Sequence, residues 1–285
     1  MSSRSSFDRA GLGLFFLLTV APVAASLLYA TLYGFGFVGL LSRGPTLEHL
    51  RRTATSTEVW ASVALSVYVA AAVVGLTTVI ALPLALSLRQ RLDREWLRYL
   101  VALPLALPGT VAALLVLQLL AGAGLVSRIA YRLGITSGID GFPSLVRDAG
   151  LVGVIVAHVG LAVPFFTLLL AELHGSERIG ALSDLAATLG ANRFQRLRFV
   201  TVPVLLRSAQ PSLALLFVLA LGSFEIPWLL GRQSPQMLSV LTYRKHGLFD
   251  ITQKPEAYLL ALGYTLLVFA MLVPAFRGRA PRDEP

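Results

Sequence analysis

One acidic side chain, Glu225, stands among apolar residues near the end of the fifth long apolar run of the chain. The rings of Phe224 and Trp228 flank it, and a carboxylate combined with ring faces attracts ammonium groups. Because Pro227 donates no backbone hydrogen bond, the carbonyl of Ser223 is predicted to be free beside the acid. Ser223, Phe224, Glu225 and Trp228 are therefore candidate residues for contact with a cationic solute.

Other side chains that commonly carry chemistry are sparse. The chain has no cysteine, which excludes disulfides, Cys-based metal sites and Cys nucleophiles. The four histidines, which show no ligand-like spacing, are His49, His158, His174 and His246. We interpret His158, inside an apolar run, as a hydrogen-bond donor in helix packing. The sequence therefore predicts no catalytic residue and no metal site.

Two phosphate-binding sequence patterns give no indication of a nucleotide site in this chain. Gly34, Gly36 and Gly39 form a G-x-G-x-x-G string, but they follow an apolar helix and no βαβ unit surrounds them. A P-loop requires Gly-Lys-Ser/Thr, and neither Lys245 nor Lys254 follows a glycine. We predict that the chain binds no ATP, magnesium or other cofactor of its own.

The elements that position these residues are long apolar helices. Hydrophobic residues make up 56% of the chain and charged residues only 14%, whereas soluble domains carry about 25% charged residues. A run of about 20 apolar residues crosses a bilayer as a helix. The six predicted spans are residues 12–33, 59–88, 97–121, 149–171, 208–230 and 257–276. We therefore predict an all-α integral membrane protein with one transmembrane domain over residues 1–285.

Basic residues suggest the orientation of these spans. Fourteen of the 24 Lys and Arg residues lie in the two termini and in the loops 89–98 and 172–207. Cytoplasmic loops are enriched in Lys and Arg, so both termini are predicted to be cytoplasmic. The net charge of +9 is then a sign of topology, and a nucleic-acid surface is the less favoured interpretation.

The cytoplasmic loop 172–207 contains an amphipathic segment. With 3.6 residues per turn, Asp184 and Thr188 point away from its apolar face. That face consists of Leu182, Leu185, Ala186 and Leu189. Gly190 follows, where a helix end favours a left-handed residue, and Asn192 is placed to cap a second helix starting near Arg193. We predict a helix, a sharp turn and another helix.

A helix of this kind could also lie on the lipid surface. Lipid-lying helices commonly carry bulky aromatics on one face and Lys or Arg on the other. Here the apolar face is Leu and Ala, with an acid opposite. That surface favours a groove on another protein.

The same segment resembles a motif of binding-protein-dependent ABC importer permeases. The motif reads E-A-A, three residues, Gly, nine residues, Ile, one residue, Leu-Pro, and the chain matches its spacing over about 20 residues. The matching residues are Asp184, Leu185, Ala186, Gly190, Val200, Val202 and Pro203. The departures are Asp for Glu, Leu for the first Ala and Val at both aliphatic positions.

The resemblance implies a type I ABC importer permease whose helix between spans 4 and 5 is a coupling helix. Such a permease, in the bacterial inner membrane, docks on a dimer of ATP-binding subunits, which hold ATP and magnesium. It pairs with a second permease, identical or paralogous, and receives solute from a binding protein outside. The region around Glu225 and residues 241–244 are similar to spermidine/putrescine-type permeases, which share this plan with thiamine, ferric-ion and sulfate permeases.

Several alternatives stay open. An ion-gradient-driven transporter or channel would show inverted repeats and more intramembrane charge, neither of which is evident. A membrane-embedded enzyme would show paired carboxylates or a histidine cluster. Glu225 either lines the solute route or pairs with a neighbouring helix or partner permease. The sequence does not identify the solute or the second permease.

Overall fold

The computed structural model describes residues 11–39, 42, 44–137, 141–247 and 250–277, which fold into helices and connecting turns with no strand among them. Arg4, Arg9 and the tail from residue 278, which contributed to the predicted topology, lie outside the described residues. The helical stretches long and apolar enough to cross a membrane are Gly11–Gly34, Thr57–Leu88, Gly109–Arg132, Val152–Ser176, Arg193–Gly222 and Ile251–Val273. The protein is thus an all-α, multi-pass membrane protein, as predicted.

The chain divides into two compact units, one formed by residues 1–60 with 241–269 and the other by residues 61–240 with 270–285. The first unit contains a π-helical turn (Phe16–Val20), α2 (Ala21–Gly34), α3 (Glu48–Thr55), a 3-10 turn (Ile251–Gln253) and most of α14 (Lys254–Arg277). Two further helices, α4 (Thr57–Leu88) and α13 (Leu238–Gly247), contribute residues to both units.

Within the first unit, α2 and α14 pack closely. A Cβ atom at Gly34 would lie 2.8 Å from Cδ2 of Leu259, so only glycine allows this approach without a shift. The rings of Tyr29, Tyr33 and Tyr258 cluster beside this contact, with the centroids of Tyr33 and Tyr258 4.7 Å apart. Small and aromatic residues together therefore define the α2–α14 contact.

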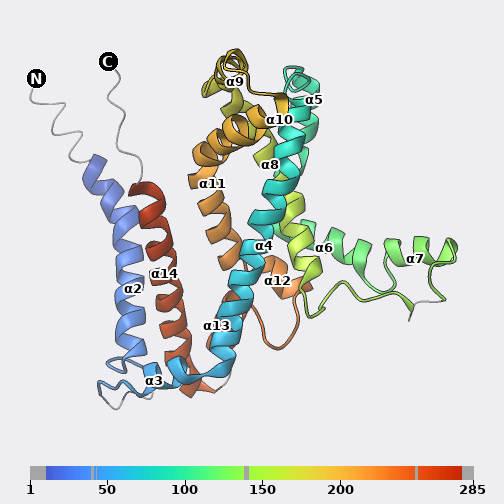
Figure 1. Cartoon of the computed structure of the whole chain (residues 1–285). Helices are drawn as coiled ribbons and strands as arrows, with labels where there is room; N and C mark the ends of the chain where they lie inside the picture. The colour runs from blue at the N-terminus through green and yellow to red at the C-terminus, as the bar shows by residue number, and fades with distance from the viewer. Residues whose placement is uncertain (1–10, 40–41, 43, 138–140, 248–249, 278–285) are drawn as a thin grey trace, which may run out of the picture. The chain divides into compact units, whose positions relative to one another are not determined.

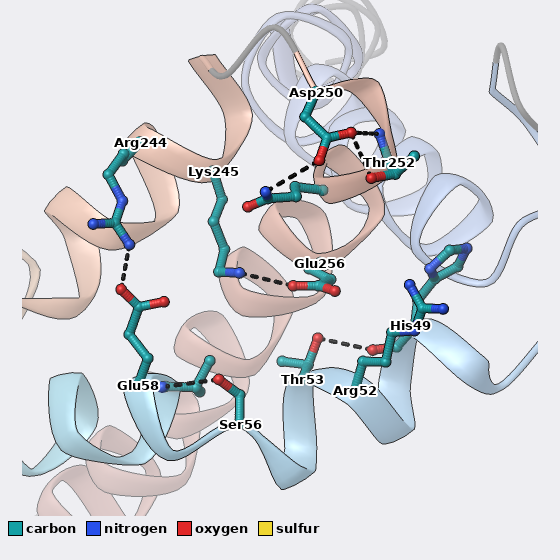
Figure 2. Close-up of polar contacts among 12 residues, drawn as sticks. His49, Arg52, Thr53, Ser56, Glu58, Arg244, Lys245, Asp250, Thr252 and Glu256 are labelled. Carbon is teal, nitrogen blue, oxygen red and sulfur yellow. Dashed lines mark hydrogen bonds and ion pairs between the residues drawn. The ribbon is translucent and has the colours of Figure 1, made fainter.

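Ion pairs connect the start of α4, α13 and α14 in the same unit (Figure 2). Arg244 pairs with Glu58, and Nζ of Lys245 lies 2.8 Å from Oε2 of Glu256. The Lys245 and Glu256 side chains are only 9% and 14% exposed. Just before α14, the Asp250 carboxylate accepts hydrogen bonds from the backbone N–H and hydroxyl of Thr252, which lower the pKa of this exposed acid. Charged contacts thus link these three helices.

The second unit contains the remaining elements. These are α5 (Glu95–Ala102), a 3-10 turn (Leu103–Ala106), α6 (Gly109–Leu120), α7 (Leu125–Arg132), α8 (Val152–Ser176), α9 (Ile179–Thr188), α10 (Arg193–Arg196), a π-helical turn (Leu197–Thr201), α11 (Val202–Gly222) and α12 (Glu225–Leu230). Its core is the contact of α4, α8 and α11, whose small alanines allow close approach. The buried residues of this core are Ala81, Ala85, Ala162, Phe166, Leu170, Ile179, Leu205 and Ala209. Figure 1 shows α9 and α10 at one end of these helices.

Two predicted spans differ from the observed helices. The span 97–121 was expected to be one continuous helix. Instead, α5 is followed by a 3-10 turn, and Leu107 and Pro108 have extended backbone just before α6. The span 208–230 is also interrupted, because α11 ends at Gly222 and Ser223 is extended. The helical stretch that contains α11 also begins earlier than predicted, at Arg193 instead of residue 208. The predicted loop 172–207 is therefore largely helical.

Candidate functional site

The amphipathic segment of the predicted cytoplasmic loop forms α9. Leu182, Leu185 and Leu189 are 41%, 61% and 83% exposed, whereas Ala186 is half-buried. Asp184 is 84% exposed and lies 4.0 Å from Nη1 of Arg196, which is also near the hydroxyl of Ser183. The predicted apolar face thus exists, and its leucines have no cover in the described chain.

The turn after α9 has the predicted form. Gly190 has a φ of +87°, in the left-handed region, and its N–H donates to the carbonyl of Ala187. Asn192 then caps α10, accepting from the N–H of Gln195 while the Gln195 side chain accepts from the N–H of Asn192. This reciprocal capping fixes the direction in which the chain leaves the turn.

One residue anchors α9 to the helices that cross the membrane. Ile179, the first residue of α9, is fully buried in the core shared by α4, α8 and α11. Beside it, the Ser208 hydroxyl of α11 donates to Oε1 of Glu177, 2.8 Å away. The start of α9 is therefore fixed to packed helices.

The last two motif positions lie in the helical stretch that leads into α11. Val200 is half-buried within the π-helical turn, and Pro203 is exposed near the start of α11, where a missing N–H is tolerated. Both follow the turn at Gly190, on the far side of that turn from the exposed leucines of α9. Together they form the base of the helix pair, where α10 runs through the π-helical turn into α11.

The second candidate region is the interruption between α11 and α12. Glu225 opens α12 and is exposed, and the rings of Phe224 and Trp228 stack with centroids 5.5 Å apart. The Ser223 carbonyl was predicted to be free, which is wrong. The hydroxyl of Ser239 donates to it because the chain after α12 folds back toward the break.

A groove of about 430 Å³ runs along α8, α11 and the break. It is lined by Leu161, Leu216 and Leu219, by Ser223, Phe224 and Glu225, and also by His158. Trp228 is not among its lining residues. Three of the four candidate pathway residues therefore share one groove, and Trp228 supports it by stacking on Phe224.

His158, which the sequence analysis assigned to helix packing, lines this groove. The side chain is 9% exposed, and its Nδ1 lies 2.8 Å from the carbonyl of Val154, which requires Nδ1 to carry the hydrogen. In the neutral ring Nε2 is then an acceptor, and it has no hydrogen-bond partner in the described parts of the chain. A buried acceptor without a partner at the edge of a groove indicates that its hydrogen-bond donor comes from outside the described chain.

Glycine at position 109 makes room for the carboxylate. A Cβ atom there would lie 3.1 Å from Oε2 of Glu225, and α12 packs against α6 at this point. Gly109 is the first residue of α6, whose N-terminal end carries partial positive charge. The Glu225 carboxylate thus lies beside the first turn of α6.

No family model matches the chain. The thiamine transport system permease protein ThiP of Brucella abortus is 30% identical over 283 residues, covering 96% of this chain and 47% of ThiP. The trehalose/maltose transport system permease protein MalF of Thermococcus litoralis is 29% identical over 211 residues, covering 72% of this chain and 70% of MalF. The chain spans about half the length of the ThiP relatives that it matches.

Solved structures agree on the fold. A bacterial ABC transporter that imports the acidic polysaccharide alginate contains a chain that superposes with a TM-score of 0.66 at 16% identity, covering 96% of this chain and 93% of that one. In the complex of the alginate transporter with an alginate pentasaccharide-bound periplasmic protein, the TM-score is 0.69 at 17% identity, with 96% and 94% covered. At these identities the likeness concerns the fold.

Proposed function

We propose that this chain is a permease of the binding-protein-dependent ABC importers and forms part of the solute pathway of an ATP-driven importer, a proposal supported by its similarity to the ThiP and MalF permeases. One observation carries the proposal: α9 exposes three leucines while its first residue is locked into the core of the membrane helices. A helix built in this way couples an external motor to the spans.

The motor is a separate subunit. The chain has no Gly-Lys-Ser/Thr sequence for phosphate binding, so ATP and magnesium bind to the partner, which is a dimer of ATP-binding subunits. Leu182, Leu185 and Leu189 enter a groove on that partner, and Asp184 and Gly190 fix the angle of the helix. Val200 and Pro203 support the base. Two states of the motor then select two states of the membrane helices.

The groove at the α11–α12 break is one wall of the pathway. The groove is open rather than enclosed, which is compatible with a pathway completed by a second permease subunit. Glu225 supplies negative charge, His158 supplies an acceptor and Phe224 supplies a ring face. These groups accept hydrogen bonds or attract positive charge, so the solute is a small cation that carries N–H donors.

Thiamine meets this description, because it combines a positive charge with aromatic rings and an amino group, and ThiP is named for its transport. Polyamines also carry N–H donors and positive charge. A neutral disaccharide, suggested by the name of MalF, gains less from Glu225, and sulfate is repelled by it. The proposed order of preference is therefore thiamine or a polyamine before a sugar.

The proposal places the chain in the bacterial inner membrane with both termini in the cytoplasm and α9 on the same side. A solute-binding protein delivers the cargo from outside. The alginate transporter complex includes a periplasmic protein with bound solute, which supports such a partner for this chain.

Reconstitution tests the proposal. The chain is co-expressed with the ATP-binding, permease and binding proteins encoded beside it and placed in vesicles, and uptake of labelled thiamine, putrescine and maltose is measured with and without ATP. Uptake that requires both ATP and the ATP-binding subunit is the expected result. Uptake driven by an ion gradient without ATP would instead make the chain a secondary transporter.

The role of Glu225 is tested separately by Glu225→Gln. Loss of thiamine or putrescine uptake in a complex that still assembles on a native gel is expected. Wild-type uptake would remove Glu225 from the pathway. Loss of the complex on the gel would mean that the acid holds the assembly together instead.

A further inference from the structure

The apolar stretch Gly109–Arg132 is not one helix, because a turn at residues 121–124 separates α6 from α7. Its second part, α7, has the surface of a membrane-interface helix rather than that of a span. Leu125, Ile129 and Leu133, spaced one turn apart, are 52%, 49% and 70% exposed. Arg128 and Arg132 follow a second line on the same helix, also one turn apart and exposed. The apolar and the basic lines run side by side.

The helix is fixed in place by its remaining side. Ser127 and Ala130 are 3% and 9% exposed, and Nε of Arg128 donates to the carbonyl of Ala123 in the turn that separates α7 from α6. Figure 1 shows α7 continuing beyond α6, away from α4 and α8. The exposed leucines and isoleucine therefore have no cover in the described chain.

A hollow of about 860 Å³ lies along the basic line. Arg128 and Arg132 line it together with Tyr131, and Leu125 and Ile129 form its apolar edge. Guanidinium groups bind phosphate oxygens through several N–H donors, and apolar side chains beside them suit acyl chains. The hollow thus combines the two chemistries of a phospholipid.

We propose that α7 lies in the bilayer surface and binds an anionic phospholipid, its phosphate at Arg128 and Arg132 and its acyl chains against Leu125 and Ile129. A soluble binding protein is the weaker occupant, because the apolar line would stand in water between docking events. The helix α9 differs in the expected way, since its polar side carries Asp184 and no arginine. Loop 121–151 and α9 lie at opposite ends of α8, so this surface is the one away from the proposed motor.

The absence of cysteine allows a direct test with single-cysteine variants. Ile129→Cys and, as a control on α9, Leu189→Cys are spin-labelled in the full chain, which is reconstituted in phosphatidylcholine–phosphatidylglycerol vesicles. At position 129 the label should collide more with oxygen dissolved in the lipid than with a water-soluble nickel chelate, and at position 189 the order should reverse. A water-exposed label at 129 would overturn the proposal, as would a label protected from both reagents, which would indicate a second copy of the chain or another protein surface.

The arginines are tested through lipid preference. A fluorophore attached at position 129 of the Ile129→Cys variant should be quenched about two-fold more by brominated phosphatidylglycerol than by brominated phosphatidylcholine at equal content. Adding Arg128→Gln and Arg132→Gln to this variant should abolish the preference while the Leu189→Cys label keeps its aqueous exposure. Equal quenching by both lipids in the chain with its native arginines would overturn the assignment of an anionic headgroup.

Discussion

The Lys245–Glu256 pair is the most deeply buried of the ion pairs recorded among the described residues. Breaking such a pair leaves one charge buried without a partner, which costs about 3 kcal/mol or more. We expect Lys245→Met to lower the midpoint of thermal unfolding in detergent by roughly 6 °C or more. The unfolding of the purified chain, followed by circular dichroism, measures this shift.

The matched control is Arg52→Gln, which breaks a pair whose side chains are 55% and 57% exposed. Exposed pairs contribute about 0–1 kcal/mol, so this variant should unfold near the native midpoint. The double variant Lys245→Met/Glu256→Met should recover part of the lost stability. An equal loss in Lys245→Met and Arg52→Gln would contradict the burial argument.

Gly109 allows a second test at the level of single residues. In Gly109→Ala the new methyl group would lie 3.1 Å from Oε2 of Glu225, so the carboxylate must move from its place in the groove by a few tenths of an ångström. We expect a several-fold fall in uptake of the transported cation with assembly unchanged. Gly160→Ala on α8 is the control, because no atom lies within 4 Å of its added Cβ, and it should transport normally.

Of the two polar residues in the groove, residue type and position in the sequence predicted the candidate role of Glu225 but not that of His158. Glu225 was recognisable as an acid in an apolar run, but His158 was assigned to helix packing. Half of that assignment agrees with the structure, since Nδ1 bonds the carbonyl of Val154 in its own helix. The unpartnered Nε2 depends on the groove between α8 and the α11–α12 break. No local sequence pattern encodes an arrangement of that kind.

Among the elements, α9 and the turn that follows were predictable because their signals are local. A four-residue apolar spacing, a glycine at the helix end and Asn192 with Gln195 three residues later each act within a few residues. The breaks in the third and fifth spans were missed, because hydropathy records how apolar a run is but not whether its backbone is continuous. The signals that could have found them are Pro108, which disfavours a helical Leu107, and Gly222 followed by Ser223.

The turn after α9 gives a prediction at this scale. Valine at the left-handed position of Gly190 costs about 1–2 kcal/mol of backbone strain, although no atom lies within 4 Å of the added Cβ. Gly190→Val should therefore tilt α9 and uncouple the system, so that ATP hydrolysis persists while uptake falls. Both rates are measured in the same vesicles.

Gly175→Val is the control for this variant. Gly175 lies in α8 with no neighbouring atom within 4 Å and without a positive φ. It should leave the ratio of uptake to hydrolysis close to that of the native chain. Unchanged uptake in Gly190→Val would refute the coupling role of the turn.

For the whole molecule, the number of spans was predictable because six apolar runs dominate the composition. The division into two units was not, because it depends on which helices pack together and on charged contacts such as Arg244 with Glu58. Sequence separation gives no warning of that pairing, since the two residues lie 186 positions apart.

The orientation of the whole chain is tested with the same cysteine-free background. Leu189→Cys on α9 and Ser144→Cys in the loop before α8 are both at exposed positions. In cells with a permeable outer membrane, an impermeant maleimide should label residue 144 and reach residue 189 only after the inner membrane is opened. The reverse pattern would place α9 outside the cell and contradict the proposed coupling.

The interruption at Ser223 also sets how far a small movement carries. The helix α11 has 21 residues and is about 31 Å long at 1.5 Å per residue. Near one end Ser208 bonds Glu177, just before α9, and near the other end Leu219 and Ala220 line the groove. A rotation of about 5° at the end nearer α9 would swing the other end by about 3 Å, on the scale of a single water molecule. The break separates α12 from α11, and α12 packs against α6 and α8. Glu225 therefore need not follow that swing, and a tilt of α11 changes the width of the groove.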